Sequence, residues 1–590
     1  MRKNNFYKRG RSLIGIILVL VVIGLISGGL YYYFSRQVPE EIVKLEEITP
    51  PPEEKLPKEE VAPPKEKVEE KPIIQKCTDG TLYGQCSTSK PKYCDNGNLV
   101  NKCGICGCSL NQVCQADGSC KIVPQKLLLL VEDNLYEGLT QELNTYSNDV
   151  KREFDFETIT KTFPSSASVF EIKSYVKQIY NNYKLNGVLL VGDLPSGKMY
   201  HPKGYYAKDN LPLYDYIYQD VYDACKYSKE WDAFDFSPTS CQQNRIQPFW
   251  ISRLTPDSST KSALSLLKDY FKRNHEYRTG QYSYERKILL YEPVIWEEVD
   301  PYRTNTISGI KNNLKAFNMY DENGIVFIDA EKENSDQLYL NEIKKPYRYE
   351  LLYVNAHGTP TFHGKNITPN DISDVSFFLG EFVSCSVGRF IAEDYIAGNY
   401  LFNGKGLVVF AAPVVIFGTG IPNPAMHYLL SIGEPLYEAI KVSPLGGSNA
   451  FGDLTLRMRY IERPTTHQPN DPIISIEPTK LYFTNTQPKM DLKIRNLGNS
   501  PLKLMNYMFL QSWYYTSKEE WQEGLSFSSW QILDGDYSHF FLNPQSEIIY
   551  TANFPTEAAP PPGAYKGEIF ILSNDPINPY LTIPFEAVVK

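Results

Sequence analysis

Apolar runs of strand length recur along the middle of the chain. Each run holds few polar residues and is bounded by Gly, Asp, Asn or Pro. Continuous apolar runs indicate strands buried on both faces, which is typical of parallel sheets covered by helices. Seven runs are predicted as strands: KLLLLVED (126–133), NGVLLVGD (186–193), KILLYEP (287–293), NGIVFIDA (323–330), YELLYVNAHG (349–358), SFFLGEFVSC (376–385) and GKGLVVFAAP (404–413).

Two amphipathic helical patterns lie between these runs, SVFEIKSYVKQIYNNYK (168–184) and STKSALSLLKDYFKRNHEY (259–277). Alternating strands and helices predict a central α/β domain with a mostly parallel sheet, which we expect over residues 123–462. Functional sites in such sheets lie at the carboxyl ends of the strands. The residues that follow each apolar run are therefore the first candidates for chemistry.

The pattern changes after RPTTHQPNDP (463–472), a polar segment with prolines. Runs such as MDLKIRNLG and LTIPFEAVVK alternate with turn residues, which predicts an antiparallel β-sandwich over 472–590. Its ending, SNDP followed by an apolar run, resembles immunoglobulin-like domains of the abnormal-spindle and Hydin type. The resemblance implies a spacer or packing domain.

The N-terminal residues predict where the chain resides. A basic tail (1–11) precedes an uncharged stretch (12–34) that is long enough to cross a bilayer core of about 30 Å. Basic residues before the span predict a single-pass anchor in the cell membrane, with the N-terminus cytoplasmic and the bulk of the chain extracellular. The alternatives are a cleaved signal peptide and a type IV prepilin, although Gly15 stands where prepilins carry Glu. Residues 37–76, rich in Pro, Glu and Lys, predict an extended stalk.

A cysteine-rich stretch follows at residues 77–122. Small and polar residues fill the gaps, so in an extracellular chain we expect a disulfide-rich module with four bridges whose connectivity is open. The other interpretation is a metal site at CGICGC, which the lack of histidine and an oxidising compartment disfavour. The cysteines are Cys77, Cys86, Cys94, Cys103, Cys106, Cys108, Cys114 and Cys120.

Three cysteines lie outside this module. Cys225 and Cys241 bracket an insertion, KYSKEWDAFDFSPTS, and predict a bridge across it. Only Cys385 is left, at the end of an apolar run and followed by Ser386. A leftover cysteine in an exported chain is an inert buried thiol, an intermolecular link or a nucleophile.

A histidine ends the neighbouring apolar run, in His357-Gly358. Adjacent strands that deliver Cys385 and His357 to one edge support acyl transfer, because a thiolate attacks a carbonyl and an imidazole protonates the leaving amine. The backbone N–H groups of Gly358 and Cys385 are the candidate oxyanion donors.

The order strand-His-Gly and then strand-Cys resembles the caspase-like cysteine peptidases, and the wider match is to their gingipain family. VLLVGD, FWISRL before a helix ending HEYR, GKGLVVFAAP and FGDLTLRM resemble further family blocks, in consistent order from Lys126 to Met458. The resemblance implies a caspase-like fold with Cys385 as nucleophile, His357 as general acid and Gly358 in the oxyanion hole.

Other positions match the family less closely. Asp193 and Asp453 fall in family blocks, where the commoner use of such residues is to cap strand ends and turns. His363 is a second candidate histidine, but His357 is preferred because it directly ends its strand. Ser384 stands where the family commonly has Ala before the nucleophile.

The third catalytic residue is open. In the family an acidic residue that assists the histidine lies just upstream of the FWISRL block. Here that stretch, NRIQPFW (244–250), has no acid, and Ser252 replaces a family Gly. Asp232 and Asp235 in the insertion are the alternatives, and the acidic insertion predicts a preference for a basic residue before the cut.

Together these features predict a membrane-anchored extracellular cysteine endopeptidase acting on proteins or peptides. The alternative is a non-catalytic surface adhesin or scaffold that keeps the peptidase fold. A net charge of -9 without a recurring basic patch argues against a nucleic-acid partner. No cofactor is required by the chemistry; Asp-rich loops are compatible with a structural calcium ion, although EF-hand spacing is missing from the sequence.

Overall fold

The computed structural model describes residues 76–589, and residues 1–75, with the predicted anchor and stalk, lie outside the described part. Within 76–589 the following are also outside it: 82, 85, 88, 107, 109–111, 123–124, 202–206, 222, 224, 236–247, 258–260, 295–318, 321, 330–333, 416–423, 442–446, 463, 485, 505–508, 516–520, 524–539 and 554–562. None of the helices in the described ranges is long and apolar enough to cross a membrane.

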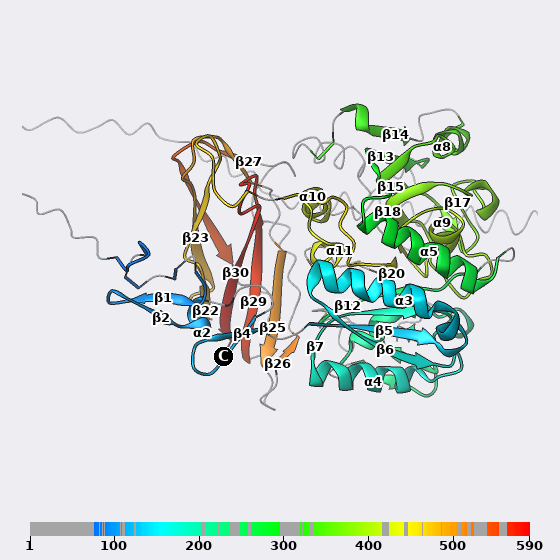
Figure 1. The fold of residues 1–590 in the computed structure, drawn as a ribbon, viewed down its shortest axis with the longest axis horizontal. Helices are drawn as coiled ribbons and strands as arrows, with labels where there is room; N and C mark the ends of the chain where they lie inside the picture. Colours follow the sequence, from blue (N-terminus) through cyan, green and yellow to red (C-terminus); the bar gives the residue numbers. More distant parts are fainter. Residues whose placement is uncertain are drawn as a thin grey trace, which may run out of the picture. The chain divides into compact units, whose positions relative to one another are not determined.

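Within the described residues, ten strands form the central sheet, in the order β14-β13-β15-β18-β19-β20-β12-β7-β5-β6 (Figure 1). All seven apolar runs predicted as strands are strands of this sheet. The strand bounds are β5 (Gln125–Glu132), β6 (Glu157–Phe163), β7 (Lys184–Val191), β12 (Trp250–Leu254), β13 (Glu285–Glu292), β14 (Ile325–Asp329), β15 (Arg348–Asn355), β18 (Ser376–Val383), β19 (Val408–Ala411) and β20 (Asn449–Gly452).

The sheet consists of two parallel halves that run in opposite directions. Strands β14, β13, β15, β18 and β19 are parallel to one another, and so are β20, β12, β7, β5 and β6. The halves join where β19 pairs antiparallel with β20. Eight of the nine strand pairings are parallel, in agreement with a mostly parallel sheet, but the carboxyl ends of the two halves lie at opposite edges. Apolar runs carry no information on strand direction, and β20 is only four residues long.

Helices cover both faces of the second half. Leu127 and Leu129 of β5 belong to the core that includes α3 (Asp133–Phe154) and α5 (Ala263–Arg278), whereas Leu128 and Leu130 face α4 (Val169–Asn182). Figure 1 shows α3 and α4 on opposite sides of these strands. Ser168 and Ser262 cap the predicted helices α4 and α5 by accepting hydrogen bonds from backbone N–H groups of the first turn.

A buried carboxylate locks the two helices to the middle of the sheet. Asp453 directly follows β20 and has no exposed surface. It accepts hydrogen bonds from Tyr146 of α3 at 2.9 Å and from Asn274 and Arg278 of α5 at 2.8 and 2.6 Å. Burial alone raises the pKa of Asp453, but the Arg278 guanidinium and these hydrogen bonds outweigh it, so the net pKa is lowered. Asp453 is a structural residue.

An insertion between β7 and β12 forms a small sheet of its own, in the order β10-β11-β8-β9. Lys173 of α4 anchors it through ion pairs with Asp220 at 3.0 Å and Asp223 at 2.6 Å. Its elements are β8 (Gly197–Tyr200), η1 (Lys208–Asn210), β9 (Leu213–Tyr214), η2 (Asp215–Gln219), β10 (Tyr227–Ser228) and β11 (Ala233–Asp235).

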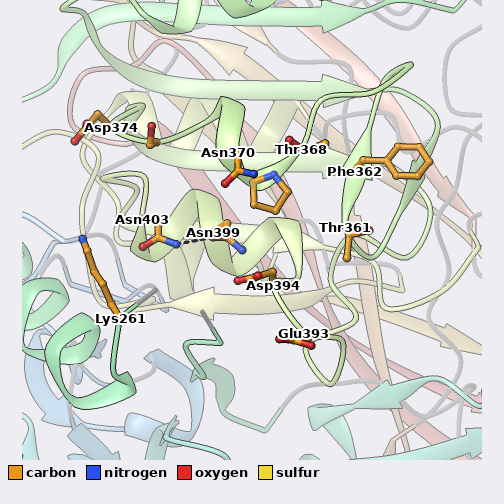
Figure 2. A pocket seen from close by; sticks show the side chains of 12 residues that line it. Lys261, Thr361, Phe362, Thr368, Asn370, Asp374, Glu393, Asp394, Asn399 and Asn403 are labelled. Atoms are coloured by element: carbon orange, nitrogen blue, oxygen red, sulfur yellow. Dashed lines mark hydrogen bonds between the residues drawn. The ribbon is translucent and has the colours of Figure 1, made fainter. Parts of the chain in front are cut away.

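Short elements complete the α/β part. A groove lies along α9 (Ile396–Phe402), where Asn399 and Asn403 face Thr368 and Asn370 across it (Figure 2). The other elements are η4 (Glu322–Gly324), α8 (Ser335–Ile343), β16 (Gly358–Thr359), β17 (Phe362–His363), η5 (Pro369–Asp371), α10 (Pro424–Ser431) and α11 (Leu436–Ala439).

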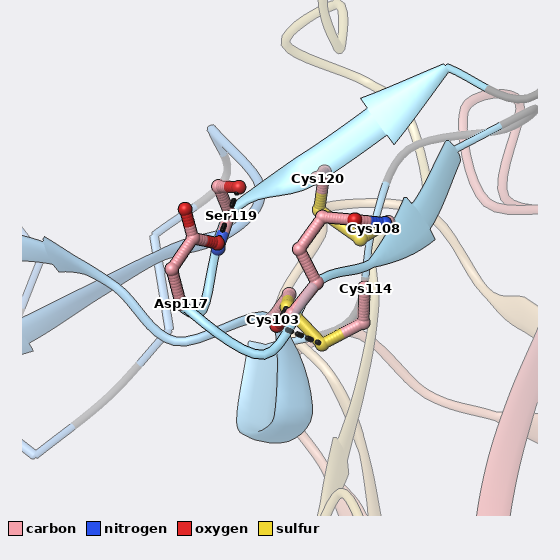
Figure 3. Close-up of a disulfide and its surroundings, with 7 residues drawn as sticks. Cys103, Cys108, Cys114, Asp117, Ser119 and Cys120 are labelled. Carbon is pink, nitrogen blue, oxygen red and sulfur yellow. Dashed lines mark hydrogen bonds between the residues drawn. A yellow bond between two sulfur atoms is a disulfide. The ribbon is translucent and has the colours of Figure 1, made fainter.

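The cysteine-rich module holds four disulfides, as predicted from the composition. They join Cys77–Cys94, Cys86–Cys106, Cys103–Cys114 and Cys108–Cys120 (Figure 3 shows the last two). The sulfur atoms of Cys103, Cys108 and Cys120 lie within 4.8 Å of one another, but each is bonded to another sulfur and is not a thiolate ligand. The module contains β1 (Lys92–Asp95), β2 (Asn98–Asn101), α2 (Cys103–Cys106), β3 (Gln112–Cys114) and β4 (Cys120–Ile122).

The C-terminal part is made of strands, in agreement with its alternating pattern. Two sheets, β21-β23-β28 and β22-β30-β29-β25-β26, contribute to a common core, and β24 pairs with β27. The pairing is antiparallel except between β22 and β30. The bounds are β21 (Ile474–Glu477), β22 (Leu481–Thr484), β23 (Lys489–Asn496), β24 (Leu502–Leu504), β25 (Phe509–Tyr515), β26 (Trp521–Glu523), β27 (Phe540–Leu542), β28 (Glu547–Asn553), β29 (Gly563–Leu572) and β30 (Tyr580–Val589).

Replacing Arg278 with Leu removes the cation beside the buried Asp453 carboxylate. Breaking a buried ion pair from one side costs about 3–5 kcal/mol, so we expect the urea midpoint of the full-length chain to fall, measured by tryptophan fluorescence. Lys441→Leu is the matched control, because Lys441 pairs with Glu438 at the surface and its loss costs less than about 1 kcal/mol. Equal midpoints for the two variants would refute the role of Asp453.

Candidate active site

His357 and Cys385 leave the same edge of the sheet on neighbouring strands. The last pair in the β15–β18 register is Asn355 with Val383. From this pair the backbone continues by two residues, to His357 after β15 and to Cys385 after β18. Since parallel strands advance together at about 3.3 Å per residue, the backbone segments at His357 and Cys385 leave this edge as neighbours.

The two turns are in close contact at Gly358. A Cβ atom added to Gly358 would lie 2.9 Å from the backbone oxygen of Cys385, 3.0 Å from Cβ of Ser384 and 2.7 Å from Cγ1 of Val387. These separations are too short for any side chain, so only glycine permits the approach. The glycine that follows His357 is therefore a packing requirement between the histidine turn and the cysteine turn.

Gly358 begins a small hairpin whose pairing orients its N–H group. Gly358 lies opposite His363, and the N–H of Gly364 donates to the carbonyl of His357 at 2.9 Å. This pattern makes Gly358 and His363 a pair without mutual backbone hydrogen bonds, so the Gly358 N–H points away from β17. That orientation suits a donor to a developing oxyanion at the edge of the sheet.

The chain turns sharply after Cys385. Ser386 has a φ of 59°, which is the left-handed region. The N–H groups of Ser386 and Gly388 donate to Val414 and Ala412 at 2.8 Å each, which fixes this turn beside the end of β19. Among the cysteines that the structure describes, Cys385 alone carries a thiol; it is half-buried, and His357 is exposed. Both groups can therefore meet a ligand from solvent.

His363, the second candidate histidine, is a core residue. Its side chain has no exposed surface, and its Nε2 lies 2.7 Å from the hydroxyl of Tyr400. The rings of Tyr291, Tyr339 and Phe382 surround it. Burial lowers the pKa of His363 to about 3, because an apolar site disfavours the charged form. His363 is thus not exposed to a substrate.

Asp193, the other supporting candidate, lies at the opposite edge. The pairings across the sheet bring Leu190 of β7 level with Gly380 of β18. From this level Asp193 lies three residues towards one edge and Cys385 five residues towards the other. Eight residues of strand span about 26 Å, so Asp193 does not support the cysteine directly. The backbone N–H of Asp193 donates to Glu132 at 2.9 Å, which is a strand-end contact.

Asp232, one of the two acidic candidates in the insertion, has partners other than His357. Asp232 pairs with Lys198 at 3.0 Å and accepts a hydrogen bond from Tyr227, which together lower its pKa. Cys225 is disulfide-bonded, whereas Cys241 and most of NRIQPFW lie outside the described residues. The predicted Cys225–Cys241 bridge and the third catalytic residue therefore stay open, and so does a structural calcium ion.

Sequence reasoning missed one residue that shapes the site. Arg253 of β12 is fully buried and forms two hydrogen bonds of 2.6 Å to Asp215 in the insertion. Its guanidinium lies 3.8 Å from the ring centroid of Phe390, in the loop that follows Cys385. Arg253 thus fastens this loop to the insertion. The signal was present in the FWISRL block, where an arginine interrupts an apolar run.

Ser384 shows a second feature that the sequence did not reveal. Its hydroxyl is buried between Val383 and Cys385 and finds no hydrogen-bond partner among the described residues. An unsatisfied buried hydroxyl costs about 1–3 kcal/mol.

No protein-family model matches this chain, and no curated protein matches it. Among solved structures, a PapD-like domain of human CEP192 is 12% identical, with a TM-score of 0.17, over 23% of this chain and 96% of that domain. The periplasmic chaperone SfaE is 12% identical, with a TM-score of 0.14, over 20% of this chain and 56% of that one. A protein of unknown function from Porphyromonas gingivalis W83 is 15% identical, with a TM-score of 0.14, over 24% and 55% of the two chains. The resemblance to gingipains stays a prediction.

Gly358→Ala tests the contact between the two turns. The added methyl must displace backbone, so we expect a loss of about 1–3 kcal/mol in unfolding free energy, measured by urea denaturation of the full-length chain. Gly104→Ala is the control, because no atom lies within 4 Å of its added Cβ. A Gly358→Ala chain as stable as the parent would mean that the turns are not in contact.

The buried His363 predicts a pH dependence of stability. Its pKa is about 3 when folded and about 6.5 when unfolded, so its contribution is complete above pH 6.5 and falls as the unfolded state takes up a proton below it. Between pH 7 and pH 5 this residue alone removes about 2 kcal/mol of unfolding free energy.

His363→Gln should flatten this part of the pH profile, measured by urea denaturation at both pH values. His275→Gln, which replaces a partly exposed histidine of α5, is the matched control. An unchanged slope for His363→Gln would show that His363 is not held neutral by the fold.

Proposed function

We propose that this chain is a membrane-anchored extracellular cysteine endopeptidase of the gingipain type, acting through a dyad of Cys385 and His357. The observation that carries the proposal is the contact of the two turns, in which Gly358 approaches the backbone oxygen of Cys385 so closely that no side chain fits. A histidine turn packed this tightly on a cysteine turn is expected where the imidazole must reach the thiol.

The reaction would start with the thiolate of Cys385 and the imidazolium of His357. The sulfur attacks the scissile carbonyl carbon, a C–S bond forms, and the carbonyl oxygen becomes an oxyanion. The N–H groups of Gly358 and Cys385 are the proposed donors to this oxyanion. As the C–N bond breaks, His357 gives its proton to the leaving amine, which leaves a thioester on Cys385.

The second half of the reaction restores the enzyme. Neutral His357 takes a proton from a water molecule, whose oxygen attacks the thioester carbonyl. The C–S bond then breaks and releases the carboxylic acid product and the thiolate. The exposure of His357 supports this step, because the imidazole must meet water once the amine product has left.

A non-catalytic surface scaffold is the second candidate. The disulfide module and the C-terminal β-sandwich favour it, since both are extra parts that catalysis on a peptide bond does not need. The two candidate functions predict different reactivity for the sulfur atom of Cys385.

A peptide-based, thiol-directed covalent probe tests the proposal on the full-length chain, with the label mapped by mass spectrometry. We expect labelling at Cys385 that is lost in Cys385→Ala and is about 10²–10⁴-fold slower in His357→Ala, the usual contribution of acid–base catalysis. His275→Ala is the control and should label at the parent rate. Slow labelling that does not depend on His357 would support the scaffold instead.

A further inference from the structure

A groove of about 650 Å³ runs along α9, apart from the cysteine turn. One wall is the tip of the hairpin that follows His357, at Thr361 and Phe362, and the opposite end is at Asp374 and Asn403. Figure 2 shows the side chains of these residues around one open space. The volume is within the range of about 300–1,000 Å³ that is typical of ligand sites.

Carboxamide side chains line the floor of the groove. Asn399 of α9 and Asn403, which directly follows the helix, are four residues apart, and Nδ2 of Asn403 donates to Oδ1 of Asn399 at 2.6 Å. Asn399 also donates to the backbone oxygen of Tyr395 at 3.1 Å, so its carboxamide is held in place. Asn370 of η5 adds a third carboxamide. Carboxamides both donate and accept hydrogen bonds, as a peptide backbone does.

The groove carries an excess of negative charge. Glu393 and Asp394 lie towards one end, and Figure 2 draws Lys261, the cation among the described lining residues, on the side of Asn403 and Asp374. Asp374 lies at the other end and pairs with Lys405 at 3.1 Å. Burial, together with the charges of Asp394 and Glu393, raises the pKa of nearby Asp257, a sign of crowded negative charge.

We propose that this groove binds an extended, basic segment of polypeptide. The fixed carboxamides along α9 would bond the peptide backbone, and Glu393 and Asp394 would pair with Lys or Arg side chains. Seven residues of helix span about 10 Å, which is the length of about three residues of extended chain. A saccharide fits less well, because Phe362 is the one aromatic side chain among the described lining residues.

The hairpin links the groove to the candidate active site. Thr361 lies four residues after His357, and the carbonyl of Pro360 accepts a hydrogen bond from Ile396, the first residue of α9, at 2.8 Å. If the chain is a cysteine peptidase, the groove is an exosite that holds a basic part of the substrate. Binding of a peptide in the groove does not itself rest on that proposed function.

Fluorescence anisotropy on the full-length Cys385→Ala chain tests the groove without cleavage. The probe is a fluorescein-labelled decapeptide of alternating Lys and Ala, compared with Glu-Ala and Ser-Ala decapeptides. We expect the Lys peptide to bind best and to weaken as salt is raised. The double variant Glu393→Gln with Asp394→Asn should weaken its binding about fivefold to tenfold.

The matched control removes two charges elsewhere, with Glu137→Gln on α3 and Asp269→Asn on α5, and should change the Kd less than about twofold. Asn370→Ala should weaken the Lys and Ser peptides alike, since it acts on the backbone. Equal effects of the groove and control variants, or no preference for the Lys peptide, would overturn the proposal. Displacement of the probe by maltopentaose would replace it with a saccharide site.

The two proposals fail in distinguishable ways. Lys-peptide binding that depends on Glu393 and Asp394 supports the groove even if Cys385 proves unreactive. If Cys385 is reactive and the groove variants leave both binding and the KM for Lys-rich substrates unchanged, the peptidase proposal survives and the groove proposal is wrong.

Discussion

Strand β20 runs against β19, and the buried carboxylate of Asp453 that follows it holds α3 and α5 to this junction. A charge without exposed surface is tolerated only when cations and hydrogen-bond donors surround it. Arg278, Asn274 and Tyr146 meet that demand together, so the helices cannot shift without leaving the carboxylate unpaired. This junction also sets the direction of every other strand, because each half of the sheet is parallel within itself.

The change of strand direction between β19 and β20 decides which residues can share a site. The edge at the carboxyl ends of β15 and β18 carries His357 and Cys385, whereas β7 and β12 end at the other edge. Asp193 is separated from the cysteine for this reason. Arg253 links the two regions, since its guanidinium contacts Phe390 in the loop that runs back from Cys385 and is bonded to Asp215 of the insertion.

Apolar packing does not explain why some buried positions of this fold carry polar side chains. Most of them are satisfied, as at Asp453 and Arg253, and these join separate elements of the fold. Ser384, which precedes Cys385, is one of the buried polar groups whose side chain has an atom with no hydrogen-bond partner among the described residues. The hydroxyl of Ser384 therefore adds no hydrogen bond to the stability of the fold among the described residues.

The sequence by itself determined the existence of most elements. Continuous apolar runs predicted seven strands of the large sheet, serines preceded the two predicted helices, and cysteine spacing predicted a four-disulfide module. These features are local, because the burial of one strand or helix requires apolar residues at regular positions along that segment of the sequence. The positions where two apolar runs end also predicted that His357 and Cys385 follow neighbouring strands, and β15 and β18 are neighbours in the sheet.

The tertiary structure alone decided what depends on contacts between distant segments. Strand direction leaves no trace in an apolar run, so the reversal at β20 and the remote position of Asp193 could not be predicted. The half-exposed β6 was missed because an edge strand lacks a continuous apolar run. The burial of His363 among tyrosines, and the need for glycine at 358, arise from residues brought together by folding; the same holds for the acidic groove along α9.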